Sequence, residues 1–459
     1  MKRAVVHRIL RGFGSNLYGQ AVVTVIQLAG VPILIHCWGV DLYGEWLILF
    51  AIPTYLSMTD LGFSQSAAND MTARAGRGDD AGALEVFQSL AVLVYLVACI
   101  GLLVVTIVCA TLPLARWLHF SQMTITDIRW VLWLFAAEVL AKLPDGVNHA
   151  GFRSQGDYAL HNSLYYSILL IQNGSVWLIA LMGLGPVSAA TAFFSVRVVA
   201  TPSIALLLTH RHSCLTFGLQ HARCDTLRRL VKPAFANISM PLALALNIQG
   251  MTLVVGSLLS PAAVVTFNTL RTLSRLTTSL VLSISNALEP ELARAWGSNN
   301  PSLLNQIFIR GLGYGVWLSV GSASVLLVFG NSIMAAWTHG RVRMDVALFQ
   351  LLLASGGVSV LWLHALGLLK ATNSHLRAAL WYAFASASAI LLAWVLIKLT
   401  RRLSDVGFAL LFLDILMLGY LLRSVSVLLD LSVPRILLEA ADPRLLLNPL
   451  TAWSRHARR

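Results

Sequence analysis

Twelve long apolar stretches run through this chain, and they restrict it to very few folds. They cover residues 16–37, 43–66, 87–112, 130–148, 162–184, 187–209, 236–258, 262–286, 311–335, 346–369, 379–398 and 406–425. Each is long enough to cross roughly 30 Å of hydrocarbon as an α-helix. The composition agrees, because 57% of the residues are hydrophobic and only 12% are charged. The sequence therefore predicts an all-α polytopic membrane protein with about twelve transmembrane helices.

The basic residues predict how these spans are oriented. Most of the 33 Lys and Arg residues fall in alternate loops and at the two ends of the chain. Cytoplasmic loops carry such an excess of positive charge, so both termini are expected in the cytoplasm. The net charge of +13 is accordingly interpreted as an orientation signal and not as a nucleic-acid-binding surface. The first apolar stretch is too long for the core of a signal peptide and is expected to be retained.

A basic segment near the middle of the chain divides the spans into two sets of six. We expect a bundle over 1–209, a basic cytoplasmic linker over 210–235, a second bundle over 236–425 and a basic tail over 426–459. A short repeat supports this division, since Ala73-Arg74-Ala75-Gly76 after the second span matches Ala293-Arg294-Ala295-Trp296-Gly297 after the eighth. Two parallel repeats would enclose a central cleft, with their pseudosymmetry axis along the membrane normal.

Two arginines inside the eighth span, Arg271 and Arg275, are the strongest candidates for a binding site. Their spacing places both on one helix face, and no acid lies between residues 260 and 288. Each charge at bilayer depth costs roughly 2.5–3.5 kcal/mol on insertion scales. Guanidinium groups suit bidentate contacts to phosphate, which favours a diphosphate-binding pair. The alternative is pairing with acids on other spans, such as Asp60, Glu138 or Asp414.

Other polar residues within the spans have two interpretations each. Arg197 in the sixth span either lines the same cleft or pairs with a neighbouring acid, and Asn268 either contacts sugar hydroxyls or packs. Asp60 and Asp414 are candidates for coupling to a proton or a sodium ion, because intramembrane carboxylates often serve that role. Asp60 has an alternative role at the end of the second span, because Gly62 follows it and glycine favours a helix terminus. Glu138 and Lys142 are expected to form an ion pair within one helix.

No cofactor is expected. The five cysteines are scattered, and the His and Cys residues between positions 210 and 224 fit no usual zinc spacing. The sequence contains no phosphate-binding loop of the Gly-x-x-x-x-Gly-Lys-Ser/Thr type, so this chain is not expected to bind ATP.

The N-terminal third resembles the polysaccharide flippases of the multidrug/oligosaccharidyl-lipid/polysaccharide exporter superfamily. The resemblance is carried by Asn16-Leu17-Tyr18-Gly19-Gln20, by the segment Trp38-Gly39-Val40-Asp41-Leu42-Tyr43-Gly44-Glu45-Trp46, and by Asp60-Leu61-Gly62-Phe63 with Ala67-Ala68-Asn69. The second half of the chain matches this family in the arrangement of its spans more than in its sequence motifs. These motifs are moderately specific, because the superfamily also contains drug and cation exporters.

The resemblance implies a flippase of the bacterial inner membrane that moves an undecaprenyl-pyrophosphate-linked glycan by alternating access. Its products would be O-antigen, capsule or exopolysaccharide. Its partners would be this glycolipid, membrane lipids, and a glycan polymerase with its chain-length machinery, with no nucleic acid. A multidrug or cation antiporter of the same fold would require an acidic cleft, whereas the predicted one is basic. A membrane-embedded glycan polymerase or ligase is disfavoured by the short external loops, so the protein is not expected to be an enzyme.

Overall fold

The computed structural model describes residues 2–58, 62–111, 120–372 and 374–443. The chain divides into two compact units. The first contains residues 1–245 and 260–265, and the second contains residues 246–259 and 266–459. The boundary at residues 245 and 246 lies inside the stretch expected as the seventh span, beyond the linker expected over 210–235.

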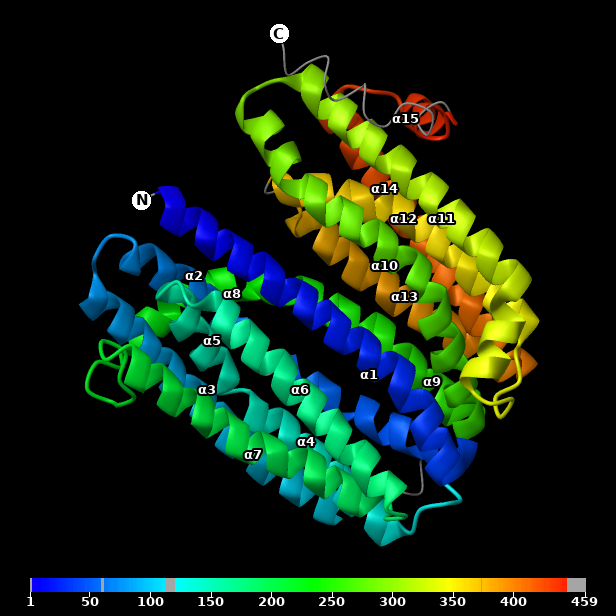
Figure 1. Cartoon of the computed structure of the whole chain (residues 1–459), viewed down its shortest axis with the longest axis horizontal. Coiled ribbons are helices and arrows are strands. Elements are labelled where there is room, and N and C mark those ends of the chain that lie inside the picture. Colours follow the sequence, from blue (N-terminus) through cyan, green and yellow to red (C-terminus); the bar gives the residue numbers. More distant parts are fainter. Residues whose placement is uncertain (1, 59–61, 112–119, 373, 444–459) are drawn as a thin grey trace. The chain divides into compact units, whose positions relative to one another are not determined.

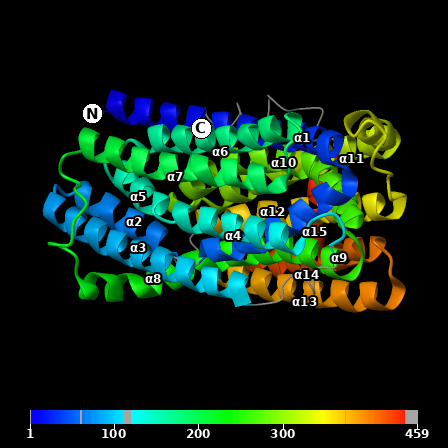
Figure 2. The same ribbon diagram turned by 90° about the horizontal axis from the view of Figure 1, so that it is seen from below.

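The regular elements described in the first unit are all helical. Its elements are α1 (Lys2–Ala51), a 3₁₀ turn (Pro53–Met58), α2 (Phe63–Ala75), α3 (Asp80–Thr111), α4 (Ile125–Lys142), α5 (Asp145–Ser154), α6 (Tyr158–Leu181), α7 (Pro186–Arg211) and α8 (Cys224–Ala245). Helix α1 packs against α6, and α4 packs against α7 (Figure 1). Helices α2, α3 and α8 lie together in the same unit (Figure 2).

The second unit begins with a π-helical segment (Leu246–Gly250) and α9 (Met251–Leu258). Helix α10 (Pro261–Gly297) starts in the first unit and continues in the second. It is followed by α11 (Pro301–Trp337), α12 (Val346–Ala371), α13 (Leu376–Thr400), α14 (Ser404–Leu429) and α15 (Val433–Ala440). Helix α14 packs against both α12 and α13, while α11 packs against α12 (Figure 1).

The all-helical, multi-span architecture is confirmed. Eight helical stretches within the described residues are long and apolar enough to cross a membrane. The span expected at 16–37 and the first residues of the span expected at 43–66 lie in one helix, α1, which is broken at Gly39, where φ is 79°. The second of these expected spans continues into the 3₁₀ turn, and its residues 63–66 begin α2. The span expected at 130–148 is divided between α4 and α5. The span expected at 236–258 is interrupted by the π-helical segment.

The two halves place their repeat residues in comparable surroundings. The Arg74 motif ends α2 and the Arg294 motif ends α10, and each is followed by a long helix, α3 or α11. With one inserted residue, Phe87 in α3 falls opposite Phe308 in α11 in the same alignment, and both side chains are fully buried. The repeat therefore coincides with matching helix ends and matching buried positions.

Candidate functional site: two arginines on α10

The two arginines of α10 have different surroundings. The side chain of Arg271 is buried, whereas that of Arg275, one turn further along, is exposed. Arg271 donates from Nη2 to Oδ1 of Asn247 at 2.8 Å and to the carbonyl oxygen of Asn247 at 3.4 Å. Its Nη1 donates to the carbonyl oxygen of Ile248 at 3.1 Å. The guanidinium also lies 5.5 Å from the ring centre of Phe267.

The π-helical segment explains why Arg271 is held there. A π-helical turn disrupts the regular hydrogen-bond ladder of the flanking α-helices, so backbone carbonyls need other donors. Asn247 and Ile248 lie in this segment, and an unsatisfied carbonyl in hydrocarbon costs several kcal/mol. Arg271 supplies the missing donors. Its partners are thus backbone and amide oxygens, and none of the ion pairs among the described residues includes it.

Arg275 is the available cation of the pair. Among the described residues, no hydrogen bond or ion pair engages its guanidinium, although the charges of Arg275 and Arg271 act on one another. Asn268, two turns before Arg275, accepts a long hydrogen bond of 3.4 Å from Thr252 Oγ1. An exposed guanidinium beside a buried one raises the local positive potential. This arrangement can attract an anion while only one of the two charges is free to bind it.

A series of hydrogen bonds and a ring contact connects Asn247, the partner of Arg271, to the carboxylate of Asp414. Nδ2 of Asn247 donates to the hydroxyl of Tyr382 at 3.2 Å, and the Tyr382 ring is 5.4 Å from that of Trp362. Nε1 of Trp362 donates to Oδ1 of Asp414 at 2.9 Å, and Ser355 donates to the other carboxylate oxygen. Asp414 is buried and its charge acts on Arg271, but it makes no direct contact with it.

Arg197 lies in the first unit and is paired with an acid. Its Nε is 3.1 Å from Oε1 of Glu138, and its Nη2 donates to Oε1 of Gln172 at 2.8 Å. Gln172 in turn donates to Glu138 and to the carbonyl oxygen of Phe193, both at 3.0 Å. The expected ion pair between Glu138 and Lys142 is wrong, because Glu138 reaches across to α7 and Lys142 donates to the hydroxyl of Tyr165 at 3.0 Å.

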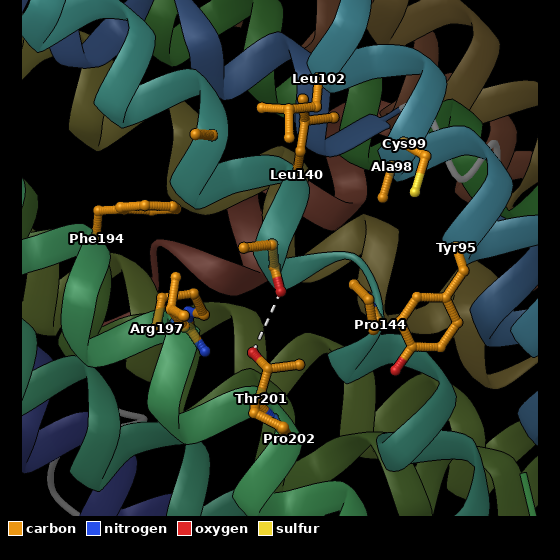
Figure 3. Close-up of a pocket in the computed structure, with 13 residues that line it drawn as sticks. Tyr95, Ala98, Cys99, Leu102, Leu140, Pro144, Phe194, Arg197, Thr201 and Pro202 are labelled. Atoms are coloured by element: carbon orange, nitrogen blue, oxygen red, sulfur yellow. Dashed lines mark hydrogen bonds between the residues drawn. The ribbon is translucent and has the colours of Figure 1, made fainter.

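An apolar groove runs beside Arg197 (Figure 3). It has a volume of about 290 Å³ and is formed by α3, α4 and α7. Nη1 of Arg197 is buried and has no hydrogen-bond partner among the described residues. At the same wall Thr201 donates to the carbonyl oxygen of Ala141 at 3.2 Å (Figure 3). The remaining lining is almost entirely apolar, with side chains such as Leu102, Leu140 and Phe194.

The structure thus brings together some of the residues singled out in the sequence. Arg271, Arg275, Asn268 and Asp414 all belong to the second unit, and Arg197 belongs to the first. Asp60 lies outside the described residues. Sequence reasoning missed Asn247, Tyr382 and Gln172. Asn247 and Gln172 are amides in apolar spans and so carried a signal, but nothing local indicates that they would meet a charged residue. Among the described residues, no group of three or more His, Cys, Asp or Glu side chains could hold a metal ion.

Comparison with known proteins identifies the fold. A structure described as the inward-facing conformation of a multidrug resistance MATE family transporter of the MOP superfamily superposes with a TM-score of 0.72. The match covers 90% of this chain and 96% of that one, at 14% identity. This is a MATE-like fold.

A second structure with the MATE-like fold has a different described role. The lipid II flippase MurJ, in an inward closed conformation, matches with a TM-score of 0.67 at 14% identity over 96% of this chain and 91% of its own. A MATE structure in a bent conformation matches with a TM-score of 0.62 at 14% identity, covering 95% of this chain and 97% of that one. No family model and no curated protein sequence matches this chain.

Proposed function

We propose that this protein translocates an undecaprenyl-pyrophosphate-linked glycan across the bacterial inner membrane, for O-antigen, capsule or exopolysaccharide synthesis. The observation that carries the proposal is the exposed guanidinium of Arg275, which lies one turn from a second, buried arginine. In an apolar helix a free cation requires a compensating anion. A pyrophosphate is a doubly suitable partner, because its oxygens accept bidentate hydrogen bonds and its charge opposes both arginines.

The two arginines then have separate roles. Arg275 contacts the pyrophosphate directly, and Arg271 contributes its field while it remains bound to Asn247 and Ile248. Asn268 lies on the same helix and offers an amide to the first sugar. The polyprenyl tail stays in the lipid. The protein exposes the headgroup site alternately to the two sides of the membrane, and no covalent bond is made or broken.

Two further lines support this choice of substrate. The motifs of the N-terminal third resemble those of polysaccharide flippases, and the MATE-like fold also occurs in a lipid II flippase. A multidrug or cation antiporter is the second candidate, because the fold also occurs in multidrug transporters. The buried carboxylate of Asp414 favours that alternative, whereas the exposed Arg275 would repel a cation. We therefore prefer the anionic glycolipid.

The test compares three substitutions on one helix in the native host. Arg275→Gln is expected to reduce surface glycan roughly 10-fold or more and to trap the lipid-linked intermediate in the inner leaflet, because a charge-assisted hydrogen bond contributes about 1.5–3 kcal/mol. Arg271→Lys is expected to have a weaker effect, since it keeps the charge. Arg294→Gln, which removes an exposed arginine paired with Glu291 near the end of α10, is the matched control.

Surface glycan, lipid-linked intermediate and membrane protein level are measured together. Normal surface glycan in Arg275→Gln, at a normal protein level, contradicts a role for Arg275 in binding the pyrophosphate. The antiporter alternative predicts the opposite pattern. In that case Asp414→Asn abolishes efflux of a lipophilic cation such as ethidium, and surface glycan is unaffected by any of the variants.

A further inference from the structure

A row of uncharged polar side chains runs along one face of α1, and the proposed pyrophosphate site does not use it. The row consists of Asn16, Gln20, Thr24 and Gln27, which follow one another at intervals of four, four and three residues. This spacing keeps side chains on one face of a helix. All four residues are exposed, and the chain has no Asp, Glu, Lys or Arg between residues 12 and 40. We call these four residues the α1 polar row.

Helix α6 packs on a different face of α1 and leaves the α1 polar row uncovered. A Cβ atom placed on Gly19 would lie 2.2 Å from Cε2 of Tyr166, and one placed on Gly30 would lie 3.4 Å from Nε1 of Trp177. Gly19 and Gly30 are about three helical turns apart, so they lie on one face. The close approach of α6 follows that face, which is also where Val22 is buried.

The depth of Gln27 determines what the row can face. Gln27 lies between Gly14, where the apolar stretch of α1 begins, and the break at Gly39. At 1.5 Å per residue it is about 18–20 Å from each, which is beyond the reach of its own side chain. Among the described residues, the side-chain amides of Gln20 and Gln27 have no hydrogen-bond partner. An unpaired amide is costly in hydrocarbon, so this face meets water or a polar ligand.

The row offers both hydrogen-bond donors and acceptors. Oδ1 of Asn16 accepts from the hydroxyl of Tyr158 at 3.2 Å and from Nδ2 of Asn162 at 3.0 Å, so α6 fixes the orientation of this amide. Thr24 donates to the carbonyl oxygen of Gln20 at 2.8 Å, which leaves its hydroxyl oxygen as an acceptor. From Asn16 to Gln27 these groups extend over about 17 Å of one rigid helix.

Sugar hydroxyl groups match this chemistry better than ions do. A hydroxyl both donates and accepts hydrogen bonds, and so does a primary amide. A phosphate offers acceptors and negative charge, but the α1 polar row has no cation to oppose that charge. A cation would find no carboxylate in the row. The length of the row also suits an extended neutral chain more than a small molecule.

We propose that the α1 polar row binds the hydroxyl groups of the translocated glycan, with Gln20 and Gln27 as its direct contacts. The row lies entirely within the first unit. It binds the neutral part of the substrate, whereas Arg275 contacts the pyrophosphate. The row thereby contributes to the choice between glycans, because a sugar that places its hydroxyls elsewhere leaves the amides unpaired. The identity of the ligand rests on the proposed function, whereas the exposure of the row to water does not.

The first experiment tests whether the row faces water. In full-length protein with its natural cysteines replaced by alanine, Gln20→Cys, Gln27→Cys and Val25→Cys are compared in permeabilised membranes. Val25 is the matched control, because it is also exposed but points away from the row on the same helix. The reagent is the cationic thiol reagent 2-(trimethylammonium)ethyl methanethiosulfonate. The two row positions should react at least about 10-fold faster than Val25→Cys, because a thiol ionises poorly in apolar surroundings.

Two outcomes of the labelling overturn the proposal. Equally slow reaction at all three positions places the row against lipid. A disulfide between two copies of Gln27→Cys, formed on mild oxidation, shows that the row instead pairs with the same row of a second chain. Protection of Gln27→Cys by the glycolipid, but not by polyprenyl pyrophosphate without sugar, supports the glycan as the ligand.

The second experiment measures binding by surface plasmon resonance to protein in nanodiscs, with the natural cysteines present. The ligands are the polyprenyl-pyrophosphate-linked glycan extracted from the host and polyprenyl pyrophosphate without sugar. Gln20→Leu/Gln27→Leu should weaken binding of the glycolipid about 10-fold, since each lost neutral hydrogen bond costs a few-fold in affinity. It should leave binding of the sugar-free lipid unchanged. Val25→Leu is the control and should change neither, whereas Arg275→Gln should weaken both.

Failure of the α1 polar row and failure of the proposed function give different results. If the unmodified protein binds both ligands and Gln20→Leu/Gln27→Leu binds the glycolipid equally well, the row does not bind the glycan and the proposed function stands. If the unmodified protein binds neither ligand, the proposed function is contradicted, and the assignment of a glycan to the row fails with it. Equal weakening of both ligands in the glutamine variant also overturns the proposal, because it indicates a general disturbance of the protein.

Discussion

At the scale of single residues, the pairing of Arg197 with Glu138 predicts that removal of one of the two charges destabilises the protein. Both side chains are buried, and removal of one partner leaves the other charge without compensation. Arg197→Met is therefore expected to destabilise the protein by about 3–5 kcal/mol, the usual cost of breaking a buried pair. Thermal unfolding in detergent would measure this loss.

The double variant Arg197→Met/Glu138→Gln provides the check on that interpretation. It removes both charges and retains an amide that can contact Gln172, so it should recover most of the lost stability. Arg211→Met is the control, because Arg211 forms an exposed pair with Asp157 at 3.6 Å that should contribute less than about 1 kcal/mol. A double variant that is no more stable than the single one would refute the pairing argument.

A second prediction at this scale concerns Glu45, which is fully buried. Its Oε1 accepts from the backbone N–H groups of Ser121 and Gln122 at 2.7 and 2.8 Å, and its Oε2 accepts from Met123 at 2.9 Å. Glu45→Gln replaces one acceptor oxygen with a donor, so at least one buried N–H loses its partner. We expect a loss of about 1–3 kcal/mol. Asp41→Asn, at an exposed position one turn earlier, should change the melting temperature little, and equal effects of the two variants would contradict the argument.

The sequence could identify the charged residues but not their partners. Arg271 and Arg275 stand out because an arginine in an apolar stretch is visible without a structure. Their different environments depend on Asn247 and Ile248, which lie 24 and 23 residues away along the chain. The partner of Arg197 lies 59 residues away in another helix. Hydropathy reports local composition, and it holds no information on which helices meet.

At the scale of elements, Gly44 sets how closely α1 approaches the start of α10. A Cβ atom placed on Gly44 would lie 2.2 Å from the carbonyl oxygen of Pro261, a backbone atom that cannot simply rotate away. Gly44→Ala is therefore expected to push the two segments apart and to lower the melting temperature. Gly14→Ala on the same helix meets nothing within 4 Å and should be neutral or slightly stabilising, because alanine favours helices. Equal melting temperatures in the two variants would contradict this close approach.

The helix boundaries show which breaks in the helices the sequence pattern could predict and which it could not. The turn expected near residues 38–42 is present as the break at Gly39, because glycine adopts its positive φ without steric cost. The break between α4 and α5 occurs beside Pro144, and proline interrupts helices by removing a donor. The π-helical segment presents carbonyl oxygens to Arg271, which lies 23 and 24 residues further along the chain. A scan of the sequence could not predict that contact.

Buried polar clusters occupy corresponding expected spans in the two predicted halves. In the first unit Arg197 on α7 reaches Glu138 on α4, and in the second unit Asp414 on α14 reaches Ser355 and Trp362 on α12. In each half, a charged residue of the last expected span contacts a residue of the span two before it in the chain.

At the scale of the whole molecule, the orientation of the chain in the membrane remains a prediction with a simple test. The excess of basic residues places the segment that contains Cys224 in the cytoplasm, and this cysteine is exposed at the start of α8. A variant that retains only Cys224 should react with a membrane-impermeant maleimide after permeabilisation and not in intact spheroplasts. Labelling of intact spheroplasts would reverse the assigned orientation and place both termini outside.

The π-helical segment lies where the first compact unit gives way to the second, and Arg271 is bonded to its carbonyl oxygens. In hydrocarbon those oxygens have no water to replace the guanidinium. The charge of Arg271 is therefore committed to the backbone of its own unit, and among the described residues only Arg275 of the pair keeps its guanidinium donors free.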